Sequence, residues 1–152
     1  MGIPMKCQHV TKTFKIVGLK GEGAFMNFGT EVPELAQQFL HRIDEVKNHS
    51  GIEIALYEPK RGHDHQEGHY YVGVMINEHV KKVPPQMNYI ETGGHYAMTR
   101  GKLKEISSLY EHLLKWLEQQ GDKRDLTQYI VETYHPMEEG EEKVVIYLPI
   151  HS

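Results

Sequence analysis

The feature that most constrains the fold is an order of predicted elements, strand, helix, strand, strand, that occurs twice in a chain of 152 residues. Apolar residues recur every three or four positions in both predicted helices, which is the period of a helix with one buried face. Both predicted hairpins join apolar runs through polar segments that contain glycine. The predicted elements are a strand over 10–17, a glycine-rich loop over 19–29, a helix over 32–47, strands over 52–57 and 70–76, a strand over 87–91, a glycine-containing loop over 93–101, a helix over 103–120, and strands over 129–134 and 144–148.

The spacing of the two copies indicates a duplicated unit. Corresponding helices and hairpins are offset by 71 to 77 positions, about half the chain. Copies of this length favour two units packed about a pseudo-two-fold axis over a solenoid, whose repeats are about 20–50 residues long. We therefore predict an α+β fold in which two βαββ repeats form an antiparallel sheet and each contributes a covering helix. A single domain over 1–152 would contain repeat one at about 8–78 and repeat two at about 86–151.

One carboxylate, Glu132, lies within an apolar run of the predicted C-terminal hairpin. A turn centred on Glu139 and Gly140 would pair Glu132 with Tyr147. Because side chains alternate along a strand, Glu132, Tyr134 and Tyr147 would then share one face. A carboxylate among aromatic rings needs a cation, hydrogen-bond donors or protonation. Glu132 is therefore the first candidate for a functional residue, although a strand glutamate more often faces water.

The predicted N-terminal hairpin supplies further candidates. Centred on Asp64, it would pair Tyr57 with Tyr71 and Ala55 with Gly73. Small residues in the first repeat would then match the carboxylate and its facing ring in the second, which would leave room for a flat ligand. A concave site between the repeats is expected, because clefts at such junctions commonly bind ligands.

Composition narrows the classes of partner. A net charge of -4 offers no basic surface for nucleic acid, so direct nucleic-acid binding is not expected. The sequence has no run of 18 apolar residues and no apolar leader, so we expect neither a membrane span nor secretion. A single cysteine, Cys7, cannot form an internal disulfide. A cytoplasmic location is the resulting expectation.

Six segments form an ordered set of motifs: ALYEPKRG, HYYVGVMI, VPPQM, GGHYAMTRGKLKEISSLYEHLLKWLEQQG, YIVETYHP and VVIYLPI. In order and spacing they resemble the GyrI-like small-molecule-binding domains, a family that includes DNA gyrase inhibitory proteins and the effector-binding domains of multidrug-responsive AraC- and MerR-type activators. The resemblance implies two βαββ repeats, as predicted above. Since the predicted ligand domain occupies the chain and leaves no helix-turn-helix, any link to transcription regulation would be indirect.

The resemblance also implies a ligand and a site. Effector-binding members of the family hold planar hydrophobic cations against a glutamate in an aromatic pocket. The resemblance therefore implies a stand-alone protein that binds hydrophobic or cationic planar compounds and has a role in multidrug or toxin response. We expect no cofactor. DNA gyrase as a protein partner follows from family analogy alone. The implied ligand-binding residues are Glu132, Tyr134 and Tyr147, then Tyr57 and Tyr71, and last Trp116, whose helical spacing also suits a core residue.

An enzymatic alternative uses the same carboxylate. Some stand-alone members of the family are similar to hydrolases that open cyclopropane-containing genotoxins with a glutamate and aromatic residues. In a hydrolase, Glu132 would act as general base or as partner to a developing cation, and Tyr147 would donate a proton.

A second alternative is a metal or haem site. His63, Asp64, His65 and His69 lie together in the loop of the first predicted hairpin. They lack the paired spacing of a structural zinc site, and a solvated polar loop explains them equally. The predicted fold is shared with haem-binding SOUL proteins, but no histidine lies on a predicted apolar strand face as an axial ligand would.

Overall fold

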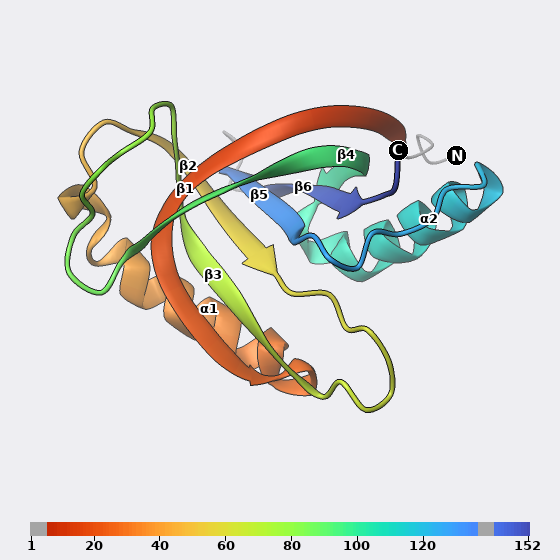
Figure 1. Cartoon of the computed structure of the whole chain (residues 1–152), viewed down its shortest axis with the longest axis horizontal. Helices are drawn as coiled ribbons and strands as arrows, with labels where there is room; N and C mark the ends of the chain where they lie inside the picture. The colour runs from red at the N-terminus through yellow and green to blue at the C-terminus, as the bar shows by residue number, and fades with distance from the viewer. Residues whose placement is uncertain (1–5, 137–141) are drawn as a thin grey trace.

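Figure 1 shows the computed structural model, which describes residues 6–136 and 142–152. Within these ranges, strands and helices follow the order β1, α1, β2, β3, β4, α2, β5, β6, which is βαββ twice and confirms the predicted α+β fold. No helix among the described residues is both long and apolar enough to span a bilayer. The elements are β1 (Gln8–Ala24), α1 (Phe28–Leu40), β2 (His49–Tyr57), β3 (Glu67–Ile76), β4 (Asn88–Lys102), α2 (Ile106–Gln119), β5 (Ile130–Pro136) and β6 (Glu142–Pro149).

The six strands are antiparallel and close into a barrel in the order β1-β3-β2-β5-β6-β4. The first part of β1, 8–18, pairs with β4, and its last part, 16–24, pairs with β3. Likewise, β4 pairs first with β1 and then, over 96–102, with β6. The repeats are joined by the β1·β4 and β2·β5 pairs, so each repeat contributes equivalent strands to both junctions.

The predicted glycine-rich loops over 19–29 and 93–101 are wrong, because most of their residues continue β1 and β4. Gly18 of β1 and Gly73 of β3 allow the two strands to pack closely. A Cβ atom added at Gly18 would lie 2.2 Å from the carbonyl oxygen of Val72, and one added at Gly73 would lie 2.1 Å from that of Val17. Only glycine fits where β1 and β3 approach this closely, so glycine here does not indicate a turn.

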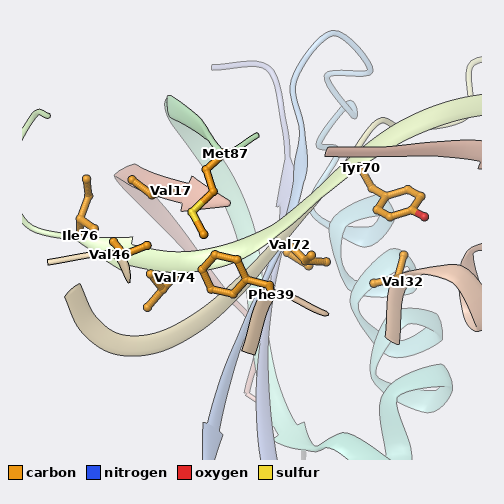
Figure 2. Packing of buried hydrophobic residues seen from close by; sticks show 10 residues of the cluster. Val17, Val32, Phe39, Val46, Tyr70, Val72, Val74, Ile76 and Met87 are labelled. Carbon is orange, nitrogen blue, oxygen red and sulfur yellow. The ribbon is translucent and has the colours of Figure 1, made fainter. Parts of the chain in front are cut away.

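Side chains pack in three layers. The barrel interior is apolar and includes Phe14, Tyr96 and Tyr147. On the outside, α1 covers β1 and β3, while α2 covers β4 and β6. Figure 2 shows the cluster under α1, where the Phe39 ring lies close to Val72 and Val74 of β3. The outer face of the central β2·β5 pair is left between the two helices.

The second hairpin pairs one residue away from the predicted register. Glu132 lies opposite Ile146, and Val131 lies opposite Tyr147. The predicted Glu132/Tyr147 pair is therefore wrong, and because a shift of one residue reverses the face, Tyr147 lies on the other side of the sheet from Glu132.

The first hairpin shows the same shift. Tyr57 lies opposite Tyr70, and Leu56 lies opposite Tyr71, so the predicted Tyr57/Tyr71 pair is also wrong. Ala55 lies opposite Val72 on β3, and on its other side it lies opposite Glu132 of β5. The predicted turn at Glu139 and Gly140 lies outside the described residues. In both hairpins the predicted pairing is wrong by one residue, because the sequence of a polar loop does not fix the register of the strands beside it.

Candidate functional site

A cleft of about 640 Å³ lies over the outer face of the β2·β5 pair. Residues of α1 line one wall, residues 103–110 at the start of α2 line the other, and residues 58–60 after β2 close one side. Side chains alternate between the two faces of β2 and β5, and this alternation determines which residues form the floor of the cleft. Ile54, Leu56 and Val131 point into the barrel, so their neighbours along each strand point out. The outward-facing floor residues are Glu53, Ala55 and Tyr57 of β2 with Ile130, Glu132 and Tyr134 of β5.

Glu132 is the most buried charged group of the cleft, with 5% of its surface exposed. Three tyrosine hydroxyls surround its carboxylate. Tyr110 of α2 donates to Oε2, and Tyr134 donates to Oε1. The Tyr57 hydroxyl lies 3.1 Å from Oε1 and 3.1 Å from the Tyr134 oxygen, so its one proton can go to only one of them. Ala55, directly opposite, adds no side chain beyond a methyl group over the carboxylate.

The partners of Glu132 are neutral. None of the ion pairs formed between described residues involves it. Burial is the largest cause that raises the pKa of Tyr57, Tyr110 and Tyr134 well above the ordinary value, and the Glu132 carboxylate raises each further. The three hydroxyls therefore remain protonated donors at neutral pH.

The cleft combines a buried carboxylate with apolar walls. Hydroxyl donors lower the cost of burying a carboxylate but leave its charge uncompensated. The walls are apolar and aromatic, with Phe25, Phe28 and Val32 on the α1 side and Ile106 on the α2 side. Aromatic faces attract cations by about 0.5–2 kcal/mol each. A positive charge that entered the cleft would therefore meet both a carboxylate and aromatic rings.

The structure brings three of the sequence-predicted site residues together. Glu132, Tyr134 and Tyr57 form one hydrogen-bonded group on the cleft floor. The fourth member, Tyr110, was not predicted, since its position on the apolar stripe of α2 marked it as a core residue. The available signal was its hydroxyl, because a buried tyrosine usually has a hydrogen-bond partner.

The other three predicted residues do not line the cleft. Tyr147 points into the barrel, where its ring packs against Phe14 at 5.0 Å between centroids. The pair of Glu132 and Tyr147 expected for a hydrolase is therefore not formed. Tyr71 packs near His69 and away from Glu132, and Trp116 packs in the cluster under α2.

Two histidines of the first predicted hairpin, His65 and His69, belong to a different network. The Glu58 carboxylate lies 2.6 Å from Arg61 Nη2, 3.0 Å from His69 Nδ1 and 3.3 Å from His65 Nε2. His69 Nε2 lies 2.7 Å from the Tyr129 hydroxyl. Within 6–136 and 142–152, no group of three or more metal-ligating side chains is arranged to hold a metal ion. These contacts fasten the loop to the end of β3.

Comparison with known proteins identifies a matching family. The family model for the GyrI-like small molecule binding domain matches residues 10–151. A search of curated proteins found no match.

Several solved structures have the same fold. The structure of SAV2435 bound to tetraphenylphosphonium has a TM-score of 0.67 at 13% identity, covering 99% of this chain and 95% of that one. The EcmrR C-terminal domain has a TM-score of 0.61 at 12% identity, with 99% of both chains covered. A hydrolase from Listeria innocua has a TM-score of 0.59 at 12% identity, covering 96% and 92%. At this level of identity the likeness establishes the fold.

Proposed function

Because the chain belongs to the GyrI-like small-molecule-binding domain family, we propose that it binds lipophilic organic cations in the cleft between α1 and α2, with Glu132 as the counter-charge. One observation carries the proposal: a carboxylate with 5% of its surface exposed lies on the floor of a 640 Å³ cleft, and its hydrogen-bond partners among the described residues are all neutral. The tetraphenylphosphonium ligand of SAV2435 is a cation of this class.

The physical basis is that the Glu132 carboxylate gains more interaction energy from a bound cation than it loses in solvation when the cation binds. Glu132 is already desolvated in the fold, so a cation that enters the cleft removes little further water from it. Tyr57, Tyr110 and Tyr134 hold the carboxylate in place, which limits the ordering cost of binding. The walls are mostly aliphatic and aromatic and offer few directional groups, so charge and size would select ligands more than detailed shape.

We propose a role that follows from such loose selectivity, namely the capture of structurally unlike toxic cations in the cytoplasm. The likeness to the EcmrR C-terminal domain supports a link to transcription regulation through another protein. Binding at Glu132 would be the event that such a partner detects.

The experiment is calorimetric titration with tetraphenylphosphonium and with tetraphenylborate, an anion of matching size. The parent protein should bind the cation and not the anion, because the cleft supplies negative charge. Glu132→Gln should weaken cation binding by about 2–3 kcal/mol, on the order of 30- to 150-fold. Glu67→Gln, at an exposed position of β3 outside the cleft, is the matched control and should bind as the parent does. Equal binding of cation and anion, or unchanged cation binding by Glu132→Gln, would contradict the proposal.

A further inference from the structure

A second carboxylate, Glu53 of β2, lies on the cleft floor beside Glu132. The strand register fixes their relation. Ala55 lies opposite Glu132, and Glu53 lies opposite Tyr134, so the two acids are diagonal neighbours on one face of the β2·β5 pair. Diagonal neighbours of an antiparallel pair are about 7–8 Å apart. The two carboxylates can therefore face one ligand at separate points.

Glu53 differs from Glu132 in its surroundings. Three hydroxyls surround Glu132, whereas no hydrogen bond or ion pair to the Glu53 side chain is formed within 6–136 and 142–152. Glu53 is partly buried, and its charged neighbour is another cleft residue, Glu142. Burial first, and then this like charge, raise the pKa of Glu53. A partly buried carboxylate beside a second one has an unfavourable environment that a cation would relieve.

We propose that Glu53 forms a second anionic subsite of the cleft, and that the preferred ligands are elongated aromatic dications whose two charges lie against Glu132 and Glu53. This inference rests on the proposed function, because it assigns the ligand class of the same cleft. Glu142, at the start of β6, adds negative charge on the side of Glu53.

The surface between the two acids suits a flat molecule. Ala55 stands beside both of them, next to Glu53 on the outward face of β2 and opposite Glu132 across the strand pair. Its methyl group leaves space for an aromatic ring. Tyr134 lies opposite Glu53, and its hydroxyl donates to Glu132, so this ring borders both subsites. A rigid rod with a positive charge at each end would span them with little loss of conformational freedom.

The test compares two probes that differ by one charge. The first is 1,1'-dimethyl-4,4'-bipyridinium, a flat dication with one charged nitrogen in each ring. The second is 1-methyl-4-(4-methylphenyl)pyridinium, in which a carbon atom replaces one of the two charged nitrogens, so that it has the same outline and a single charge. Both are titrated by calorimetry into the parent protein, Glu53→Gln and Glu67→Gln at low, fixed ionic strength. Circular dichroism and thermal melting establish that each variant is folded.

We expect the parent and Glu67→Gln to bind the dication about tenfold more tightly than the monocation. In Glu53→Gln this ratio should fall to about one, mainly through weaker dication binding. An equal affinity of the parent for both probes, or a ratio that Glu53→Gln leaves unchanged, would overturn the second subsite while leaving cation binding at Glu132 intact. A parent protein that binds neither these probes nor tetraphenylphosphonium would overturn the proposed function, and this inference with it.

Discussion

Tyrosines have different roles on the two faces of the barrel wall. Inside the barrel, Tyr96 and Tyr147 pack edge-on with Phe14, and their rings fill space. Outside, in the cleft, Tyr57, Tyr110 and Tyr134 direct their hydroxyls at Glu132. Register therefore determines whether a tyrosine in a strand belongs to the core or to the site, since a shift of one residue along the strand exchanges the two faces.

The largest expected effect lies on the inner face. Phe14 is fully buried between the Tyr96 and Tyr147 rings. Phe14→Ala should lower the free energy of unfolding by about 3–5 kcal/mol, because it removes a large apolar side chain and leaves a cavity. Urea unfolding followed by circular dichroism measures this. A loss below about 1 kcal/mol would show that the barrel interior is not the main core.

The next effect, on the outer face, should be a loss of ligand binding without a loss of stability. Glu132→Gln should weaken tetraphenylphosphonium binding by the 2–3 kcal/mol given above, yet change the free energy of unfolding little or raise it, because an uncompensated buried charge is removed. The affinity for tetraphenylphosphonium and the free energy of unfolding should be measured on the same preparation. A large loss of stability without loss of binding would mean that Glu132 serves the fold and not the ligand.

The loop after β2 provides a pH test. Burial alone would raise the pKa of Glu58, but hydrogen bonds and charge from Arg61 and His69 outweigh it and hold the pKa below its ordinary value. A lowered folded-state pKa stabilises the protein above the unfolded pKa of about 4.3, and this stability is lost as pH falls through the folded-state pKa. Glu58→Gln should therefore be less stable than the parent at pH 7, by about 1–3 kcal/mol.

The comparison of melting temperatures for Glu58→Gln and the parent should be made between pH 3 and pH 7. The gap should narrow toward the acidic end, because the parent then loses the charge of Glu58. A gap that stays constant over this range would mean that the contacts of Glu58 act without its charge.

The smallest effect compares single hydroxyls on the two faces. Tyr134→Phe removes a donor to Glu132 and should weaken tetraphenylphosphonium binding by about 0.5–1.5 kcal/mol. Tyr147→Phe removes a hydroxyl that Lys12 Nζ reaches at 3.3 Å on the inner face, and should leave binding unchanged. Calorimetric titration of both variants distinguishes them. An equal effect on binding would contradict the assignment of the two tyrosines to different faces.

Much of this organisation could be predicted from the sequence. Helical and strand periods gave the repeated element order, and the isolated carboxylate of an apolar strand singled out Glu132. Tyr134 followed from alternation along the strand of Glu132, and Tyr57 followed from the family resemblance. These features depend on local pattern, which a single sequence records directly.

What could not be predicted depends on non-local geometry. The register of the two hairpins determines which tyrosines lie on the face of Glu132, and it places Tyr147 and Tyr71 on the other face. Tyr110 joins the site only because α2 lies beside β5 in space. The glycines over 19–24 and 93–101 indicated loops when considered alone, whereas these segments continue β1 and β4.

The most direct test of the central claim is a crystal structure of the protein soaked with tetraphenylphosphonium. Ligand density is expected in the cleft, with the phosphorus centre on the Glu132 side of the floor and phenyl rings against Tyr57 and Tyr134. Ligand density elsewhere on the molecule, with the cleft filled by rearranged side chains from α1 or α2, would contradict it.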